Sequence, residues 1–456
     1  MKVATKELTA VSLVEEALEK IERYKNYNIF TFINAENALK KAKEIDEKIA
    51  RGENVGRLAG VPYALKDNFL SPEGETTASA LILKPFKSPI TSTIVKKLEA
   101  EGAIMIGRTN LDAFAHGSST ENSYFGPTLN AKDETRVAGG SSGGSAVAVA
   151  LDIVQFATGT DTGGSIRQPA SFNGVYGLKP TYGATSRYGV VAMASSTDTM
   201  GFFTKNPDDL DLLMSITSGK DENDLTTLPD FYNLSEPKEV KKVGIIKNFD
   251  NDAVAPEIRA VLKEKVENLK SKGYEIVELD MPTLKYALAA YYIIVPAEVA
   301  SNLSRYDGVR YGFRSENSGD LDGLFSNTRS EGFMAENKRR IMIGNFVLSS
   351  GFYDAYYLKA QKARTLIVKE YEKAFEKCDV ILTPVAPNPA FKLGEKVNDP
   401  IAMYLEDVMS VPVNLAGIPG LSVPVGETEA GLPLGLQILA PRRGDKTLIE
   451  FSKELN

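Results

Sequence analysis

The sequence predicts an α/β protein with a largely buried β-sheet, and three observations support this fold class. From residue 60 onward, short apolar runs alternate with helical patterns and glycine-rich turns. Each apolar run is short and nearly continuous, which is typical of strands covered on both faces. The chain has 456 residues, 43% of them hydrophobic and 25% charged, so it can bury a large core without disulfides or a structural metal.

The individual elements follow from these patterns. We expect buried strands at 61–65, 103–107, 153–158, 175–178, 242–247 and 274–279. We expect helices at 92–102, 145–151, 255–272 and 362–378. The segment 312–334 is rich in Gly, Ser and Asn, and we expect an ordered loop there.

The N-terminal part has a different texture. Val14, Leu18 and Ile21 recur at helical spacing, and 35–50 follows a second, more charged helical pattern. We therefore expect a helical portion over residues 1–55, followed by one continuous body over residues 56–456. The polar residues 219–240 are expected to form a surface connection within that body.

Composition excludes several classes of function. A net charge of −7 gives no global attraction to nucleic acid, although a local basic patch stays open. One histidine and one cysteine cannot form a multi-histidine or cysteine-cluster metal site, so we predict no metal. Cys378 is expected to be a small buried residue. No run of 18 apolar residues and no apolar N-terminal segment is present, so we expect a soluble, cytoplasmic protein.

Candidate catalytic and binding motifs are most concentrated in the Gly- and Ser-rich segment 136–169, for which several interpretations compete. A flexible linker is disfavoured because the glycines are embedded in apolar sequence. The phosphate-binding patterns with a following Lys-Ser/Thr or acidic partner are absent, but backbone N–H groups there could bind an anion or an oxyanion. Residues 140–144 fit the G-x-S-x-G elbow, yet that fold needs a later histidine, and the one histidine, His116, comes earlier.

A serine nucleophile needs a base, and two candidates exist. His116 could serve, although a loop histidine with local hydrogen bonds is the more common case. Lys66 ends an apolar run that would carry it into the interior, where burial lowers the pKa of an amine. Taken alone, Lys66 is better explained by a salt bridge with its neighbour Asp67.

Three segments together resemble the amidase signature family: GVPYALKDN (60–68), GGSSGGSA (139–146) and GTDTGGSIRQPASFNGVYGLKPTYG (159–183). The resemblance implies the amidase signature fold, a large mixed β-sheet flanked by helices on both faces. It also implies a catalytic triad in which Ser165 is the nucleophile, Ser141 follows a cis peptide and relays the proton, and Lys66 is the base. Ser142 is a less favoured relay.

The same resemblance implies further roles around the triad. Backbone N–H groups of Thr162, Gly163, Gly164 and Ser165 would bind the oxyanion. An ion pair that braces the loop is the favoured interpretation of Asp161 and Arg167, and a structural role that of Lys179. The sequence departs from the family pattern at Ala138, where proline is usual, and at Asn173, where a small residue is usual.

Within the family, the segments 116–130, 187–205, 301–314, 338–361 and 411–426 resemble one subgroup, the glutamine-hydrolysing subunits of tRNA-dependent amidotransferases. This implies glutamine as substrate and ammonia delivered to a partner B subunit. That partner would use ATP and Mg²⁺ and would bind Glu-tRNA(Gln), and a C subunit would complete the enzyme. No cofactor is expected in this chain.

A site for free glutamine must also hold its α-carboxylate and α-ammonium groups. The family pattern assigns Arg340 to the carboxylate and Asp407 to the ammonium, with Tyr291 nearby. Core packing is an equal alternative for Tyr291. The alternative function is a stand-alone amidase that hydrolyses small-molecule amides.

Overall fold

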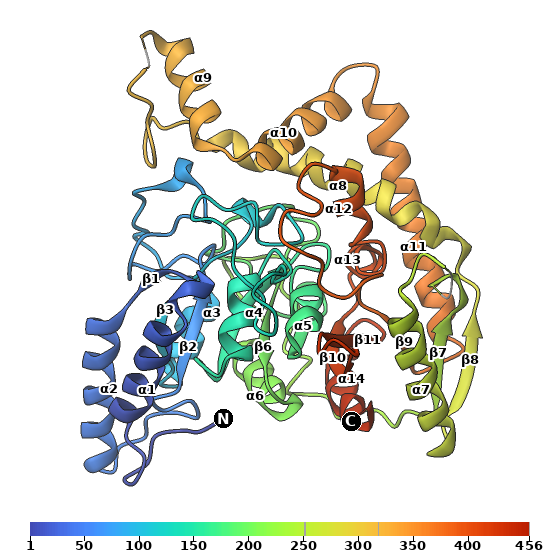
Figure 1. The fold of residues 1–456 in the computed structure, drawn as a ribbon, viewed down its shortest axis with the longest axis horizontal. Coiled ribbons are helices and arrows are strands. Elements are labelled where there is room, and N and C mark those ends of the chain that lie inside the picture. Colours follow the sequence, from blue (N-terminus) through green and yellow to red (C-terminus); the bar gives the residue numbers. More distant parts are fainter. Residues whose placement is uncertain (250–251, 318, 456) are drawn as a thin grey trace.

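One large sheet organises the chain in a computed structural model that describes residues 1–249, 252–317 and 319–455. In this described part, eleven strands follow the spatial order β1-β3-β2-β4-β6-β5-β10-β11-β9-β7-β8 (Figure 1). Their bounds are β1 Phe30–Ile33, β2 Pro62–Lys66, β3 Ile104–Thr109, β4 Phe156–Asp161, β5 Tyr176–Lys179, β6 Thr199–Thr204, β7 Lys242–Ile246, β8 Glu275–Leu279, β9 Val380–Pro384, β10 Gly420–Glu427 and β11 Pro433–Leu439.

The sheet is mixed. Strand β2 runs parallel to both β3 and β4, and β7 runs parallel to both β8 and β9. The remaining neighbours pair antiparallel: β1 with β3, and each successive pair from β4 through β6, β5, β10 and β11 to β9. This arrangement confirms the predicted α/β class.

Fourteen α-helices surround the sheet among the described residues. Their bounds are α1 Ala10–Arg23, α2 Ala35–Ala50, α3 Thr93–Ala100, α4 Gly143–Ala150, α5 Arg167–Asn173, α6 Pro207–Thr217, α7 Pro256–Ser271, α8 Ala287–Asn302, α9 Leu321–Gly332, α10 Ala335–Leu348, α11 Lys359–Phe375, α12 Pro400–Leu405, α13 Val411–Ala416 and α14 Asp445–Ser452. Short 3-10 or π turns lie at Lys25–Tyr27, Leu81–Leu83, Ala113–Ala115, Lys247–Phe249, Pro282–Tyr286, Leu303–Arg305, Tyr353–Leu358 and Lys453–Leu455.

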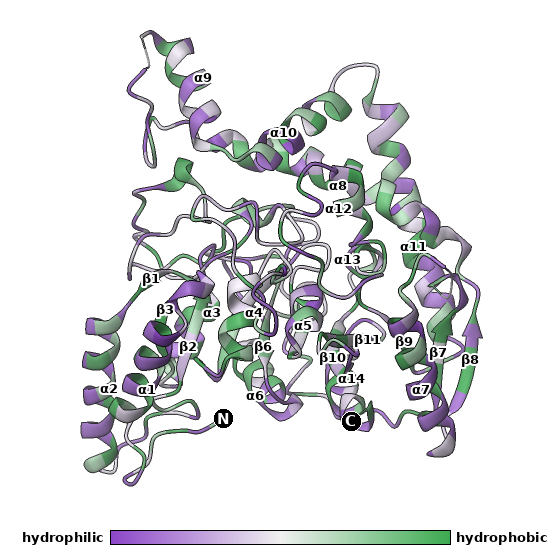
Figure 2. Cartoon of the chain, viewed as in Figure 1, coloured by the Kyte–Doolittle hydropathy of each residue, from purple (hydrophilic) through white to green (hydrophobic). Residues whose placement is uncertain are grey.

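Helices cover both faces of the sheet, as predicted. Successive strand residues point to opposite faces. In β2, Tyr63 and Leu65 belong to one apolar cluster, which includes residues of α3 and α6, whereas Ala64 belongs to a second cluster with residues of α1, α2 and α4. Two cores therefore sandwich the central strands. The outer helices α1 and α2 alternate hydrophilic and hydrophobic residues along their length, as surface helices do (Figure 2).

All six predicted strands and all four predicted helices are present, but two local predictions were wrong. The N-terminal portion also holds a strand, β1, which pairs antiparallel with β3 at the edge of the sheet. The segment 312–334 holds helix α9, which begins after Asp320, whose side chain accepts the Gly323 N–H at 2.7 Å. An N-cap of this kind starts a helix in otherwise loop-like sequence. The division at residues 55 and 56 stays a prediction.

The parallel pairing of β2 with β4 determines which loops of the chain lie close together. The carboxyl ends of parallel strands meet at one edge of the sheet, where the loops that follow them lie close together. Figure 1 shows α8 and α10 at one end of the molecule and both termini at the opposite end. The loops after β2 and β4 lie on the side of α8, because Tyr291 of α8 contacts Gly163.

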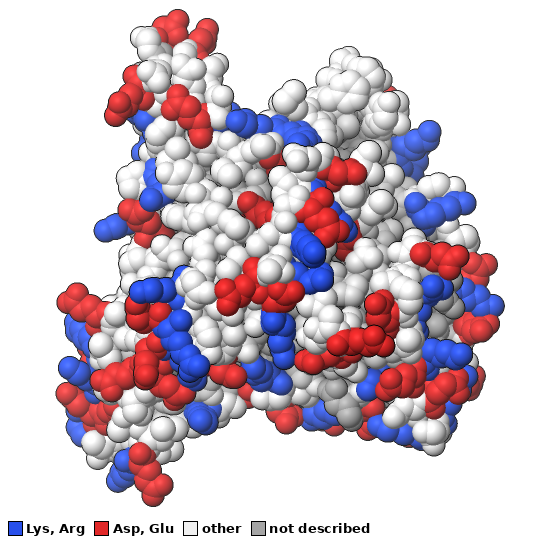
Figure 3. All heavy atoms as spheres, in the orientation of Figure 1, with Lys and Arg blue, Asp and Glu red and all other residues white. Residues whose placement is uncertain are grey.

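Two further properties of the chain are its surface charge and the hydropathy of its helices. On the face that Figure 3 displays, Lys and Arg are interspersed with Asp and Glu, both at the edges and in the centre. This face therefore carries no large positive field of the kind that binds nucleic acid. None of the helices in the described part of the chain combines the length and apolar character that a membrane span requires.

Candidate active site

Strand β2 carries Lys66 into the interior, where it meets Ser141 and not Asp67. The Lys66 Nζ lies 2.9 Å from Ser141 Oγ and 2.8 Å from Thr160 Oγ1, and the residue is fully buried. Burial lowers the pKa of the Lys66 amine to about 7. Asp67 instead lies 3.5 Å from Arg108, so the salt-bridge interpretation of Lys66 is wrong. An amine with this pKa can accept a proton near neutral pH.

The glycine-rich loop before α4 presents Ser141, and its backbone is fastened at several points. The Gly140–Ser141 peptide is cis. The Thr120 hydroxyl donates to Gly139 O at 2.7 Å and accepts the Gly143 N–H at 3.1 Å. The Gln168 side chain accepts the Gly140 N–H at 2.9 Å. These bonds orient Ser141 toward Lys66.

The neighbouring Ser142 faces a different way. Its hydroxyl donates to Thr160 O at 3.3 Å, and its N–H donates to Ser165 O at 3.2 Å. Ser142 therefore ties the loop of Ser141 to the loop of Ser165. The bond from Lys66 to Ser141 favours Ser141 over Ser142 as the proton relay.

Ser165 lies between β4 and α5, on the loop that follows the carboxyl end of β4. It is 8% exposed, whereas Lys66 and Ser141 are fully enclosed. Within the described residues, its hydroxyl makes no hydrogen bond, which leaves Oγ available to a substrate. The loops of Ser165 and Ser141 thus meet, and the end of β2 holds the buried amine of Lys66 against Ser141, as a nucleophile, a relay and a proton acceptor require.

The backbone donors of this loop divide into two groups. The Gly164 N–H donates to Asp161 Oδ1 at 2.8 Å, so it is not free to bind an oxyanion. The N–H groups of Thr162, Gly163 and Ser165 make no hydrogen bond within the described residues. We therefore remove Gly164 from the predicted oxyanion hole and keep the other three donors as the prediction.

The ion pair predicted for Asp161 and Arg167 is present and fully buried. Arg167 Nη2 lies 3.0 Å and Nε 3.1 Å from the two Asp161 oxygens. Burial alone would raise the pKa of Asp161, but the charge and hydrogen bonds of Arg167 hold that pKa far below its usual value. Asp161 also accepts the Ile166 N–H at 3.1 Å. A permanently charged carboxylate thus shapes the nucleophile loop.

The predicted glutamine-binding residues come together around Tyr292, which the sequence had not singled out. The Tyr292 hydroxyl donates to Asp407 Oδ2 at 2.9 Å, and the Arg340 guanidinium lies 5.2 Å from the centre of the same ring. Burial raises the pKa of Asp407 to about 7, although Ser118 and Tyr292 both donate to it.

Arg340 retains unused donors in this pocket. It is 3% exposed and its Nε donates to Glu336 Oε1 at 2.8 Å. Among the described residues, its two terminal nitrogens have no hydrogen-bond partner. A buried guanidinium with unused donors suits a carboxylate ligand, which can accept two parallel hydrogen bonds.

Three contacts link this pocket to the nucleophile loop. A Cβ added to Gly163 would lie 2.5 Å from the Tyr291 hydroxyl. The hydroxyl therefore packs directly against this glycine. Ser410 donates to Gly163 O. Gln168, which holds Gly140, also donates to Ser118 O at 3.0 Å, and Ser118 donates to Asp407. The core-packing alternative for Tyr291 is compatible with this position, since the residue is buried.

The remaining sequence expectations have clear positions. His116 is buried and has the local contact expected of a loop histidine, since its Nδ1 lies 3.3 Å from Ala113 O; the same Nδ1 also lies 2.6 Å from Nδ2 of Asn337, which is distant in sequence. Lys179 is buried and donates to Pro180 O at 2.9 Å. Cys378 is buried, as predicted. The two departures from the family pattern contact each other, because Asn173 donates to Ala138 O at 2.7 Å.

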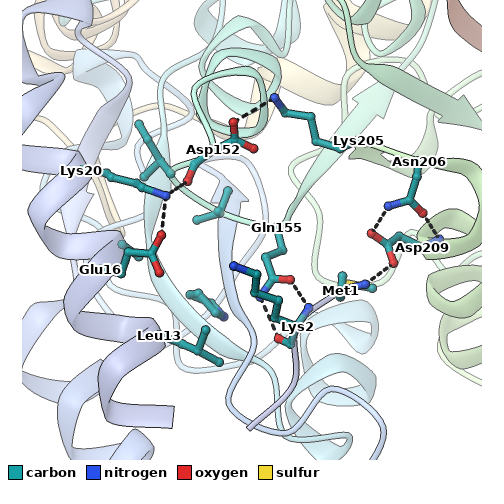
Figure 4. A pocket seen from close by; sticks show the side chains of 14 residues that line it. Met1, Lys2, Leu13, Glu16, Lys20, Asp152, Gln155, Lys205, Asn206 and Asp209 are labelled. Carbon is teal, nitrogen blue, oxygen red and sulfur yellow. Dashed lines mark hydrogen bonds and ion pairs between the residues drawn. The ribbon is translucent and has the colours of Figure 1, made fainter. Parts of the chain in front are cut away.

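A separate pocket of about 630 Å³ lies beside α1 (Figure 4). Four of its charged side chains pair with one another: Lys20 with Glu16, and Lys205 with Asp152. It contains none of the predicted site residues. No group of three or more His, Cys, Asp or Glu able to hold a metal ion was found among the described residues.

Several residues of the site were not predicted from the sequence: Thr160, Asp112, Ser118, Gln168, Tyr292 and Ser410. Thr160 and Gln168 lie within the segment that carries the resemblance, so their position was a usable signal. Ser118 lies within 116–130 and Tyr292 is adjacent to Tyr291, so these positions were usable signals as well. Asp112 and Ser410 lie outside the quoted segments, and only the folded chain brings them to the loops.

Comparisons with known proteins agree with one another. A family model described as Amidase matches residues 12–449. The chain is 49% identical to the A subunit of the glutamyl-tRNA(Gln) amidotransferase of Cyanothece sp., over 96% of this chain and 92% of that protein. It is 51% identical to the protein of the same name from Persephonella marina, over 91% and 87%.

Solved structures show the same likeness. The A subunit of the glutamyl-tRNA(Gln) amidotransferase of Thermotoga maritima matches with a TM-score of 0.80 and 38% identity, covering 99% of this chain and 92% of that one. A bacterial aryl acylamidase of the amidase signature family matches with a TM-score of 0.86 and 25% identity, covering 99% and 93%.

Proposed function

The chain belongs to the amidase family, and from this premise we propose that it hydrolyses glutamine as one subunit of an enzyme that converts Glu-tRNA(Gln) to Gln-tRNA(Gln). The observation that carries the proposal is its likeness to the glutamyl-tRNA(Gln) amidotransferase chains over nearly the whole sequence. The buried contact between Lys66 and Ser141 supports amide hydrolysis as the chemistry.

The reaction begins with acylation of Ser165. Its Oγ attacks the carbonyl carbon of the glutamine side-chain amide, its proton passes to Ser141, and the Ser141 proton passes to the neutral amine of Lys66. The free N–H groups of Thr162, Gly163 and Ser165 stabilise the oxyanion, and losing one such donor typically costs about 2.7–4 kcal/mol of activation free energy.

Collapse of this intermediate releases ammonia. The C–N bond breaks, and the proton held by Lys66 returns through Ser141 to the leaving nitrogen. Water then attacks the ester on Ser165, and Lys66 accepts and returns a proton through the same relay. The products are glutamate, ammonia and the free Ser165 hydroxyl.

Free glutamine is recognised by its α-carboxylate and α-ammonium groups. Arg340 binds the carboxylate with its unused donors, and Asp407 binds the ammonium once its carboxyl group is ionised. Tyr291 closes the pocket beside Gly163. Support for this assignment comes from Tyr292, which contacts both Arg340 and Asp407.

The released ammonia is used by partner proteins. A B subunit binds Glu-tRNA(Gln) and uses ATP with Mg²⁺ to activate the glutamyl group, and a C subunit completes a cytoplasmic heterotrimer. This chain itself needs no cofactor for the serine and lysine chemistry described above.

The alternative, a stand-alone amidase that acts on small amides, has less support, because the relatives named as amidotransferase subunits share more sequence with this chain than the aryl acylamidase does. A subunit needs its B and C partners to form Gln-tRNA(Gln), whereas a stand-alone amidase is fully active by itself. The test is to purify the chain alone and with B and C subunits, and to measure glutamine-dependent formation of Gln-tRNA(Gln).

The proposal predicts that the assembled enzyme forms Gln-tRNA(Gln) from glutamine and ATP, and that Ser165→Ala in the same assembly does not. Exogenous ammonium should restore product formation by the Ser165→Ala enzyme, since the partner's step is intact. Rapid hydrolysis of simple amides by the isolated chain, without glutamine-dependent amidation in the assembly, would favour the stand-alone amidase.

A further inference from the structure

Asp112 is a fully buried carboxylate that the mechanism above does not use. Its Oδ2 accepts the Thr120 N–H at 2.9 Å and the Ser119 N–H at 3.3 Å, and its Oδ1 accepts the Asn122 N–H at 3.1 Å. None of the ion pairs within the described residues includes it. A buried carboxylate without a cationic partner is costly, so its presence calls for an electrostatic explanation.

The carboxylate of Asp112 lies directly behind the peptide that carries Ser141. A Cβ at Gly140 would lie 2.1 Å from Asp112 Oδ2, so glycine alone allows this approach. The Asp112 N–H also donates to Ser141 O at 3.1 Å. Asp112 therefore contacts both sides of the Gly140–Ser141 peptide, and Ser141 Oγ in turn accepts the bond from Lys66.

Three buried carboxylates act electrostatically on Lys66, and they differ in their own partners. Asp112 acts on the pKa of Lys66 most strongly, ahead of Asp161 and Asp198, and all three oppose the effect of burial. The charge of Asp161 is neutralised by Arg167. Asp198 accepts the Thr162 hydroxyl at 2.8 Å and belongs to the oxyanion side of the site. Asp112 is thus the carboxylate that balances Lys66 on the Ser141 side.

We propose that Asp112 is a positioning residue that fixes the Ser141 peptide and supplies the counter-charge for the Lys66 ammonium formed when Ser141 gives up its proton. This inference rests on the proposed function. During acylation a proton moves from Ser165 through Ser141 to Lys66, which creates a positive charge in an enclosed site. A carboxylate held by three backbone N–H groups can stabilise that charge without rearranging.

The carboxyl and the amine should also titrate as a pair. Burial, and to a lesser degree the charge of Glu121, raise the pKa of Asp112 against the hydrogen bonds from the backbone, to about 7, and the pKa of Lys66 is also about 7. Interacting groups with similar pKa values share their protons, so the pH dependence of the reaction belongs to both residues. This behaviour provides a test that loss of structure alone cannot imitate.

The test is the pH dependence of kcat for glutamine hydrolysis by the assembled enzyme, comparing wild type with Asp112→Asn. The acid limb of kcat reports groups in the substrate complex, where Asp407 is already paired with the substrate ammonium. Removing a carboxylate that favours the charged amine must lower the pKa of Lys66. The expected result is an acid limb displaced by about one pH unit to lower pH, with a plateau about tenfold below wild type.

Two further variants make the outcome decisive. Asp445→Asn removes another fully buried carboxylate, which accepts the Thr181 N–H at 2.7 Å and interacts electrostatically with Lys179; it should leave the acid limb in place. Asp112→Ser removes the charge but keeps an acceptor oxygen, and should displace the limb in the same direction as Asp112→Asn.

The proposal would be overturned if the acid limb of either Asp112 variant stayed at the wild-type pH or moved to higher pH. Failure of both Asp112 variants to fold, while Asp445→Asn folds, would also overturn it, because Asp112 would then support the fold and not the charge. A wild-type assembly that hydrolyses no glutamine would instead refute the proposed function.

Discussion

Replacing Tyr292 by Phe removes one hydrogen bond from the predicted glutamine pocket and leaves the aromatic ring in place. The hydroxyl donates to Asp407 Oδ2 at 2.9 Å. The ring lies 3.9 Å from the ring of Tyr404, and Arg340 lies over it, so both contacts survive the change. The substitution therefore tests only the hydrogen bond that Tyr292 donates to Asp407.

The magnitude follows from the charge of the acceptor. A hydrogen bond to a charged group contributes about 1.5–3 kcal/mol, which corresponds to roughly a 10- to 100-fold change in binding. Without the donor, the Asp407 carboxylate is less stable, and its pKa, already raised by burial to about 7, rises further. The KM for glutamine should rise by roughly 10- to 100-fold, whereas kcat should change by less than about threefold.

The assay is steady-state glutamine hydrolysis by the assembled enzyme at pH 8, where Asp407 of the wild type is ionised. Tyr371→Phe is the matched control, because its buried hydroxyl has no hydrogen-bond partner among the described residues, and its KM should equal that of the wild type. A Tyr292→Phe enzyme with KM within a factor of two of wild type would refute the assignment of Asp407 to the substrate ammonium.

Three other outcomes are expected. Gly163→Ala places a Cβ 2.5 Å from the Tyr291 hydroxyl, and should lower kcat more than about tenfold without changing the circular dichroism spectrum, because overpacking displaces the nucleophile loop. Arg167→Met leaves the Asp161 carboxylate buried without its partner, and should lower the free energy of unfolding by about 3–5 kcal/mol in urea titrations; a loss under about 1 kcal/mol would contradict this. The wild-type KM for glutamine should fall as pH rises through about 7, because Asp407 must ionise to bind the ammonium, and a KM independent of pH between 6 and 8 would argue against it.

The fold was largely predictable because its strands are short, apolar and separated by strong turn signals. The runs at 61–65 and 103–107 became β2 and β3, and the charged pattern at 255–272 became α7. Strand β1 was missed because its four residues, Phe30–Ile33, lie between helices and gain their order from pairing with β3. Pairing partners distant in sequence leave no local signal.

The site was predictable to a lesser degree. Lys66, Ser141 and Ser165 were singled out, although Lys66 alone resembled a salt-bridge residue until the fold separated it from Asp67. Gly164 was assigned to the oxyanion hole because its neighbours are in that loop, but its N–H points to Asp161. The direction of one amide depends on backbone torsion, which composition does not determine.

Tyr292 and Asp112 illustrate what sequence could not provide. Tyr292 is adjacent to Tyr291, and a sequence cannot decide which of two tyrosines on α8 reaches Asp407, 115 positions away. Asp112 precedes Gly140 by 28 positions, and only the close approach of its carboxylate to that glycine reveals its place beside Ser141.

The most direct test of the account is to identify the covalent intermediate. The assembled enzyme is mixed with glutamine, quenched with acid during turnover, digested and studied by mass spectrometry. The expected product is a γ-glutamyl ester on the peptide that contains Ser165, and neither ester nor ammonia is expected from Ser165→Ala. A glutamyl adduct on a different residue, or ammonia release by Ser165→Ala at the wild-type rate, would contradict it.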